Sequence, residues 1–342
     1  AAGPTEVIDL DTIRLQVVAR SPSGEPELAS VATADLFNEA SSAWKAGRGK
    51  DAIGLFRRLV GDFPDSSYAP LSLHNIAAIY DGQGDHDSTI TTLRELIAAY
   101  PASRVSVTGH LYIAAIVSER KRWPEALRTL EEVLARDNLT FQDRVEALAR
   151  KGYVLLEQGA LDPADAALVA AIDQWRRAPR IDDVYFIAMA HYYRGEVAHR
   201  RFAAVKVQLP DDQLGKSLDA KEALAVVAYD RWRDALPHRH AHWATASGYQ
   251  MSQVFFELWE AAVTAPYPSA MSQQARAPYV REVHVRMRSY LQKSLEGHQM
   301  NVGLAEAYGV STAWSEASKS RAMQIMEILA KEAKGEFVRP SS

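Results

Sequence analysis

From Ala32 onward, apolar residues recur at three- and four-residue spacing along almost the whole chain. Ile53, Phe56, Leu59 and Val60 illustrate the pattern. This spacing places the apolar side chains on one face of an α-helix, so the pattern predicts an all-α protein. Residues 7–18 instead alternate between apolar and polar side chains and favour a β conformation. Residues 21–27 (SPSGEPE) are typical of a linker. Residues 1–30 are therefore expected to form an extended N-terminal arm.

A repeat appears when the chain is shifted against itself by 37 residues. Four sets of positions then align: Ala40, Ala77 and Ala114; Ala52, Thr89 and Ala126; Phe56, Leu93 and Leu130; and Pro64, Pro101 and Asn138. Turn-forming stretches lie between the first and second sets: KAGRGKD (45–51), DGQGDHD (81–87) and SERKRWPE (118–125). Each unit is therefore predicted to be a pair of antiparallel helices.

The four sets have distinct roles in such a hairpin. Small side chains allow the two helices to approach closely, the aromatic residue or leucine fills the space behind them, and proline ends the second helix. A fourth copy follows with one extra residue, in which Gly152 and Ala164 take the small positions and Leu168 the large one. About four hairpins are expected over residues 31–180.

These spacings resemble the tetratricopeptide repeat. The resemblance rests on Ala40, Ala52, Phe56 and Pro64, and on the equivalent positions of the second unit. The chain departs from the usual motif at Thr89, at Asn138 and in the fourth copy, which lacks the proline. The resemblance implies an α-solenoid of stacked hairpins whose first helices line a concave groove that binds other proteins.

The amino-acid sequences at the ends of the first two repeats, DFPDSSYAP (62–70) and AYPASR (99–104), are similar to those of bacterial cell-envelope members of this family. These include lipoproteins of outer-membrane assembly and periplasmic proteins associated with the Tol system. The similarity implies a periplasmic or outer-membrane-associated location, with the cytoplasm left open as the alternative. The start AAGPTE, without methionine, is expected to follow a processed N-terminal signal or a lipid anchor.

Residues 181–342 continue the pattern in looser form, as degenerate repeats. Long helices are predicted over 183–204, 218–236, 241–263 and 278–309, with an insertion at 207–217 that contains Pro210. Residues 314–334 are predicted to form an amphipathic helix. That helix is expected to cap an array whose last unit would otherwise expose an apolar face.

The totals exclude several kinds of partner and chemistry. Lys and Arg number 39 against 43 Asp and Glu, without long blocks of one sign, so neither nucleic acid nor a polybasic membrane surface is an expected partner. The absence of cysteine excludes disulfides and thiol catalysis. No stretch has the length and apolar character of a membrane-spanning helix.

No motif predicts an enzyme or a cofactor. His238 and His242 are four residues apart and would share a helix face, but no third metal ligand accompanies them, so a structural role is favoured. The glycine-containing stretches 47–50 and 82–85 lack the strand and the Lys-Ser/Thr pair of a phosphate-binding loop. We expect no catalytic residue, no metal and no cofactor.

Function is therefore expected in the groove lined by the first helices. Register within the repeat places the following residues at inward positions: Asn38, Ser41, Trp44, Asn75, Tyr112, Arg150 and Tyr153. An asparagine amide both donates and accepts hydrogen bonds, so it is suited to hold an extended peptide backbone. The sequence predicts a non-enzymatic scaffold that binds a protein of the cell envelope. The alternative is a module that binds a small ligand between the long helices of residues 183–309.

Overall fold

The computed structural model describes residues 13–20 and 26–337, and the side chains from Ala32 onward. The chain divides into two compact units, Ala1–Leu139 and Thr140–Ser342. Over the described residues, thirteen α-helices account for nearly all the regular structure, as the all-α prediction required. The exception is the N-terminal arm, where β1 (Ile13–Arg20) and β2 (Pro26–Ala32) form an antiparallel pair with Ile13 opposite Ala32. Residues 1–12 and 21–25 of the predicted arm lie outside the described residues.

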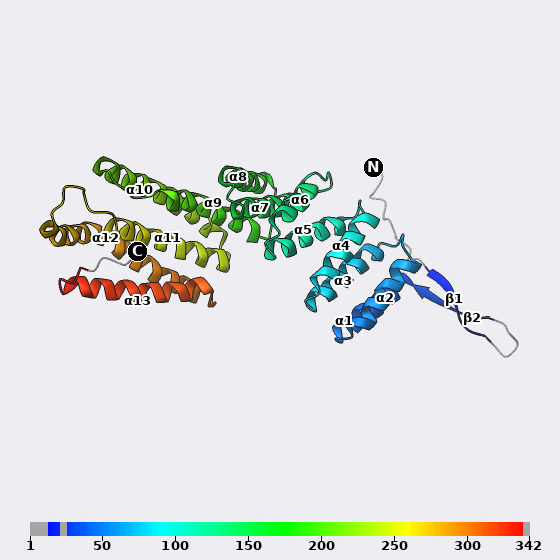
Figure 1. Cartoon of the computed structure of the whole chain (residues 1–342). Helices are drawn as coiled ribbons and strands as arrows, with labels where there is room; N and C mark the ends of the chain where they lie inside the picture. Colours follow the sequence, from blue (N-terminus) through cyan, green and yellow to red (C-terminus); the bar gives the residue numbers. More distant parts are fainter. Residues whose placement is uncertain (1–12, 21–25, 338–342) are drawn as a thin grey trace, which may run out of the picture. The chain divides into compact units, whose positions relative to one another are not determined.

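The first unit contains three antiparallel helix hairpins, which follow one another in Figure 1. Their helices are α1 (Thr33–Lys45) with α2 (Gly49–Asp62), α3 (Tyr68–Gly82) with α4 (His86–Ala99), and α5 (Arg104–Glu119) with α6 (Trp123–Leu134). Helix α2 also packs on α3 and α4 on α5, and the first helices α1, α3 and α5 contact one another in turn. The three predicted hairpins are therefore confirmed.

The repeated positions form the core of these hairpins. Nine residues are fully buried: Ala40, Ala77, Ala114, Ala52, Thr89, Ala126, Phe56, Leu93 and Leu130. Thr89, which replaces the usual alanine, satisfies its hydroxyl by donating to the backbone carbonyl of Asp85 at 2.8 Å. This bond removes the cost of burying the polar atom, which explains why the substitution is tolerated.

The turns inside the hairpins share one geometry. Gly47, Gly84, Lys121 and Gly159 each have a positive φ, between 57° and 78°. In each turn, the backbone N–H of that residue donates to the carbonyl three residues earlier, for example Gly84 to Asp81 at 2.8 Å. This pattern ends a helix in the left-handed conformation that glycine adopts without strain. Lys121 therefore occupies a position where glycine is favoured.

Asn138 shows how the third hairpin ends without proline. Its side-chain Nδ2 donates to the carbonyl of Ala102 at 3.3 Å, and its own carbonyl accepts from Nη1 of Arg104 at 2.9 Å. Ala102 and Arg104 flank the start of α5, so the amide connects two successive loops. Hydrogen bonds thus replace the conformational restriction that Pro64 and Pro101 provide in the first two hairpins.

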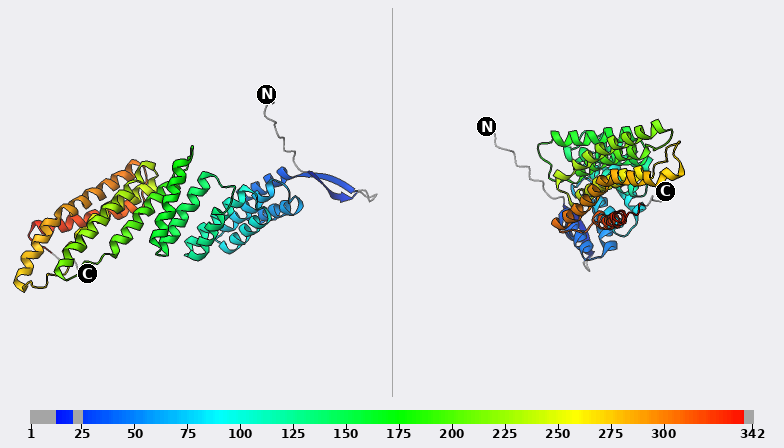
Figure 2. Two further views of the ribbon diagram at one scale, coloured as in Figure 1. Left: turned by 90° about the horizontal axis from the view of Figure 1, so that it is seen from above. Right: turned by 90° about the vertical axis from the view of Figure 1, so that its left-hand side faces the viewer.

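The second unit contains three further hairpins and a final helix. Their helices are α7 (Phe141–Glu157) with α8 (Leu161–Arg177), α9 (Tyr185–Ala204) with α10 (Asp211–Arg233), α11 (Ala241–Val263) with α12 (Gln273–Ala307), and then α13 (Ala313–Ala333). Helices α7, α9, α11 and α13 contact one another in sequence, which is the contact pattern of the first helices in the first unit. Figure 2 shows the long helices side by side.

Two helix starts differ from the sequence prediction. Residues 211–217, predicted as part of an insertion, belong to α10, because Pro210 precedes the first turn and Asp211 and Asp212 favour the positive end of the helix dipole. Helix α12 starts at Gln273, five residues before Pro278. Pro278 lacks the N–H that would bond to the carbonyl of Gln274, but both residues are exposed, so that carbonyl is not buried without a partner.

The boundary between the two units lies after Leu139, whereas the sequence predicted a boundary at residue 180. The fourth hairpin, α7 and α8, packs against α9 and shares its core, so it lies in the second unit. No described helix has the length and hydropathy needed to cross a membrane.

Candidate protein-binding face

The first helices of the first unit bring three predicted site residues onto one face. Asn38 on α1, Asn75 on α3 and Tyr112 on α5 are 37 residues apart, and α1, α3 and α5 lie next to one another. Asn38 is exposed, whereas Asn75 and Tyr112 are half-buried. We refer to the surface formed by Asn38, Ser41, Trp44, Leu71, His74, Asn75 and Tyr112 as the first-helix face.

The part of this face on α1 combines an apolar and a polar group. Trp44 is 37% exposed, which is high for an indole ring in a folded protein. Ser41 is half-buried and its hydroxyl donates to the carbonyl of Phe37 at 2.8 Å. The Ser41 hydroxyl is thus engaged within its own helix, and Asn38 and Trp44 are the two predicted site residues of α1 that are exposed.

A hydrogen-bonded group connects α3 and α5. The Tyr112 hydroxyl donates to Oδ2 of Asp81 at 2.6 Å, and Nδ1 of His86 lies 3.1 Å from Oδ1 of the same carboxylate. Burial raises the pKa of Tyr112, and the bond to Asp81 raises it further. Tyr112 is therefore neutral and fixes the orientation of α5 against the end of α3.

His74 lies beside this group, with its ring centroid 6.2 Å from that of Tyr112. Burial lowers the pKa of His74, and a hydrogen bond with the Asn75 side chain opposes that shift. The imidazole is therefore neutral near pH 7. The central part of the first-helix face is polar without carrying a positive charge.

Sequence reasoning missed Asp81, His74 and Leu71. Asp81 lies 37 residues after Trp44, so the repeat register that identified Asn75 and Tyr112 also contains the signal for Asp81. Leu71 lies one helical turn before Asn75 on the same face of α3 and is 39% exposed. No comparable signal distinguishes His74.

Arg150 and Tyr153 lie on α7, in the second unit, where both contribute to packing. Arg150 donates through Nε to Oε1 of Glu146 at 2.8 Å, and its guanidinium carbon lies 5.0 Å from the ring centroid of Phe186. The ring of Tyr153 lies 4.8 Å from that of Tyr193 on α9. Burial raises the pKa of Glu146, and the charge of Arg150 opposes this shift. Both predicted residues thus connect the helices of their own unit.

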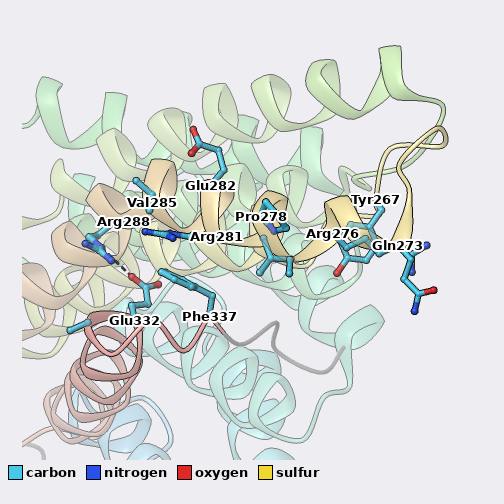
Figure 3. A pocket seen from close by; sticks show the side chains of 14 residues that line it. Tyr267, Gln273, Arg276, Pro278, Arg281, Glu282, Val285, Arg288, Glu332 and Phe337 are labelled. Atoms are coloured by element: carbon cyan, nitrogen blue, oxygen red, sulfur yellow. Dashed lines mark hydrogen bonds and ion pairs between the residues drawn. The ribbon is translucent and has the colours of Figure 1, made fainter.

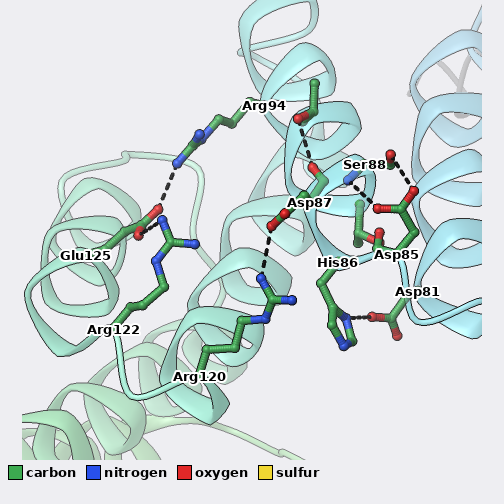
Figure 4. A network of polar contacts seen from close by, with 11 residues as sticks. Asp81, Asp85, His86, Asp87, Ser88, Arg94, Arg120, Arg122 and Glu125 are labelled. Carbon is green, nitrogen blue, oxygen red and sulfur yellow. Dashed lines mark hydrogen bonds and ion pairs between the residues drawn. The ribbon is translucent and has the colours of Figure 1, made fainter.

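Charged residues gather instead along the second helices and the turns of the first unit. Arg57 on α2 pairs with Glu95 on α4 at 2.5 Å, and Arg94 pairs with Glu125 on α6 at 2.8 Å. Figure 4 shows the second of these pairs together with Arg120, which contacts Asp87 at 2.9 Å. Such exposed pairs contribute at most about 1 kcal/mol each. These ion pairs connect neighbouring hairpins, so the charged side chains that form them already have partners within the protein.

His238 and His242, the two candidate metal ligands, lie on different helical segments. His238 lies in a short 3-10 helix (Leu236–His238), Arg239 then has φ 57°, and α11 starts at Ala241. His238 and His242 therefore do not share a helix face, contrary to the prediction. His238 stacks on His191 with 5.2 Å between the ring centroids. No cluster of three His, Cys, Asp or Glu side chains suited to a metal ion occurs among residues 32–337.

A family model agrees with the repeated hairpins. A family model described as "Tetratricopeptide repeat-like domain" matches residues 27–182. No curated protein matches the chain in sequence. Solved structures that resemble it include PilF of Pseudomonas aeruginosa, with 12% identity, TM-score 0.46, and coverage of 84% of this chain and 96% of PilF.

Two further structures show a similar degree of likeness. The C-terminal part of a TPR repeat-containing protein of Cytophaga hutchinsonii has 13% identity, TM-score 0.45, and coverage of 84% of this chain and 95% of that chain. MamA of Desulfovibrio magneticus RS-1 has 15% identity, TM-score 0.37, and coverage of 57% and 94%. The repeat spacing and the hairpins agree with the family model: residues 27–182 consist of tetratricopeptide-like repeats.

Proposed function

We propose that this chain is a non-enzymatic scaffold of the bacterial cell envelope and that its first-helix face binds a segment of another protein. The tetratricopeptide-like fold itself suggests a protein-interaction scaffold. The observation that carries the choice of surface is the exposed indole of Trp44 on a helix that also presents Asn38. Tryptophan is enriched among the residues that dominate binding energy at protein interfaces.

The remaining residues of the face suit an extended peptide. Asn38 offers an amide that donates and accepts, and Asn75 adds the part of its amide that does not bond to His74, so a peptide backbone is recognised without a strict sequence requirement. Leu71 adds a second exposed apolar contact where α3 begins. The Tyr112 hydroxyl donates to Asp81, so Tyr112 would contact a peptide through its ring and not as a hydrogen-bond donor.

The envelope location is part of the proposal. It is supported by the amino-acid sequence of the repeats around Pro64 and Pro101. The absence of cysteine also fits an oxidising compartment, because no unpaired thiol can form an unwanted disulfide there. The partner would then be a periplasmic or outer-membrane-associated protein.

Affinity capture tests the proposal. The full chain is used as bait in bacterial envelope extract, and captured proteins are identified by mass spectrometry. A partner retained by the wild type is expected to be lost on combining Asn38→Ala with Trp44→Ala. The matched control combines Lys50→Ala with Arg128→Ala, which are exposed on the second helices α2 and α6. Equal capture by both double variants would place binding elsewhere.

One cavity favours the small-ligand alternative. A volume of 610 Å³ lies between α11, α12 and the end of α10, lined by Met251, Phe255, Met300 and Leu304 among others. Its size and apolar walls are typical of small-molecule sites. If no protein is captured, and apolar compounds raise the melting temperature of the wild type but not of Met300→Asp, a charge at an exposed position of the lining, this alternative replaces the scaffold.

A further inference from the structure

A large cleft lies in the second unit between the first half of α12 and the end of α13. Its volume is 1360 Å³. Figure 3 shows Arg276, Arg281 and Arg288 along α12, with Glu332 and Phe337 on the other side of the cleft. The cleft belongs to neither the first-helix face nor the 610 Å³ cavity.

The first half of α12, which forms one side of this cleft, is largely exposed to solvent. Every residue from Gln273 to Pro278 is exposed, as are Arg281 and Glu282. The first buried side chain of the helix is that of His284. The first one and a half turns of α12, together with Arg281 and Glu282, thus present their side chains to solvent instead of to another helix of the unit.

The two carboxylates of the cleft are already neutralised. Glu332 is buried and accepts from Nε of Arg288 at 3.1 Å, while Nδ1 of His284 lies 2.8 Å from its other oxygen. Glu282 accepts from Nε of Arg286 at 2.7 Å. Arg288 and Arg286 are therefore the partners of these acids.

Arg276 and Arg281 are left with their charge uncompensated. Within residues 32–337, neither guanidinium forms an ion pair with a carboxylate. Arg276 lies over the ring of Tyr267, 4.8 Å from its centroid, which holds the side chain at the mouth of the cleft. The cleft therefore has a net positive lining that attracts an anionic partner.

Apolar side chains lie between the arginines. Val285 is 49% exposed, and it shares a face of α12 with Arg281 and Arg288 because these residues are three and four positions apart. Phe337 is half-buried on the opposite side. A simple anion would leave these groups in water, whereas a peptide with acidic and apolar side chains would use both kinds of contact.

We propose that this cleft binds an extended acidic segment of a partner protein, with acidic and apolar residues in alternation. Arg276 and Arg281 both line the cleft; they are five residues apart, about 7.5 Å along the helix axis and about 140° around it. Side chains two residues apart on an extended strand point the same way and are about 6.6 Å apart. Two such carboxylates pair with the two arginines, whose side chains both line the cleft, and the apolar side chains, which point the other way along the strand, contact Phe337 on the opposite side.

Fluorescence anisotropy of the full chain with a labelled peptide of alternating glutamate and valine tests this proposal. The wild type is expected to bind the peptide, and Arg276→Glu combined with Arg281→Glu to weaken binding at least about tenfold. Both positions are exposed, so the variant is expected to keep the circular dichroism spectrum and melting temperature of the wild type. Arg233→Glu, an exposed charge reversal on α10, is the matched control and should bind normally.

Further measurements separate this site from the alternatives. Affinity should fall as salt concentration rises, and a lysine-valine peptide should not bind. Equal binding of polyglutamate would remove the apolar part of the proposal, and no binding to the wild type, or unchanged binding to the double variant, would overturn it. The Asn38→Ala and Trp44→Ala variant should bind the peptide normally, since its residues lie in the other unit.

Discussion

Gly152 on α7 lies so close to Leu168 on α8 that a Cβ atom at position 152 would be 2.4 Å from Cγ of the leucine. Non-bonded carbon atoms are at their optimum near 3.5–4.0 Å, so no side chain fits there while Leu168 keeps its place. Ala40, Ala77 and Ala114 hold the corresponding position in the three preceding hairpins. The fourth hairpin therefore differs from the others in the size of residue that its helix crossing accepts.

Gly152→Ala should lower the free energy of unfolding by about 1–2 kcal/mol. The cost of overpacking a filled core, about 1–3 kcal/mol, exceeds the gain of up to about 1 kcal/mol from the higher helix propensity of alanine. Urea unfolding followed by circular dichroism measures the change. The matched control is Gly303→Ala on α12, which is exposed and has no neighbour within 4 Å, so it should stabilise the protein. Stabilisation by both variants would show that the α7–α8 contact is looser than described.

The hairpin core could be predicted from the sequence because the same steric requirement recurs every 37 residues. Repetition reveals which positions must be small and which large, even when Gly152 or Thr89 replaces alanine. The starts of α10 and α12 carried no such repetition. Pro278 was predicted to begin α12 but lies inside its second turn, and α10 begins directly after Pro210 and not at residue 218.

The candidate site was predictable only in part. Register identified the positions of Asn38, Asn75 and Tyr112, because it depends on the backbone alone. It did not show that Tyr112 would bond to Asp81, or that Arg150 would lie over Phe186, because such contacts depend on rotamers and on a neighbouring helix. Periodicity thus locates a face and leaves open which of its groups remain free.

Lys121→Gly should raise the free energy of unfolding by about 0.5–1 kcal/mol. Lys121 has φ 57°, in the position that glycine occupies in the other three hairpin turns of residues 31–180. The left-handed conformation costs a side-chain-bearing residue about 1–2 kcal/mol, and the added freedom of glycine in the unfolded chain offsets part of the gain. Thermal and urea unfolding measure the effect.

Lys45→Gly is the control for the Lys121 variant. Lys45 ends α1 with helical geometry, so glycine there should destabilise the protein by up to about 1 kcal/mol. If the two lysine variants changed stability in the same direction, backbone strain at Lys121 would not be the cause.

A double-mutant cycle at Gly195 and Trp232 should show strong coupling. A Cβ at position 195 on α9 would lie 2.1 Å from Cδ1 of Trp232 on α10, and the indole is fully buried. Gly195→Ala alone should destabilise the second unit by about 3 kcal/mol, and Trp232→Leu alone by a similar amount through the cavity it leaves. The combined variant should lose at least about 1 kcal/mol less than the sum, because the methyl group enters the vacated space. Additive losses would contradict this contact.

His298 makes the second unit sensitive to acid. It is buried on α12, with Nδ1 3.2 Å from Oγ of Ser318 on α13. Burial, followed by the charge of Arg321, lowers its pKa to about 4 from the ordinary value of 6.5. Between these values the unfolded chain binds a proton that the folded protein excludes, so the contribution of neutral His298 is complete above pH 6.5 and is lost as the pH falls toward 4.

His298→Gln should therefore flatten the loss of stability between pH 6.5 and about 4. A shift of this size corresponds to about 3 kcal/mol of pH-dependent stability. His191, whose pKa burial lowers to about 3, contributes in the same direction and remains in the variant, so a smaller slope should persist. Urea unfolding at several pH values in this window measures the slope. The matched control is His86→Gln, whose half-buried ring lies in the first unit. If that control flattened the profile as much as His298→Gln, the acid sensitivity would not arise from the contact between α12 and α13.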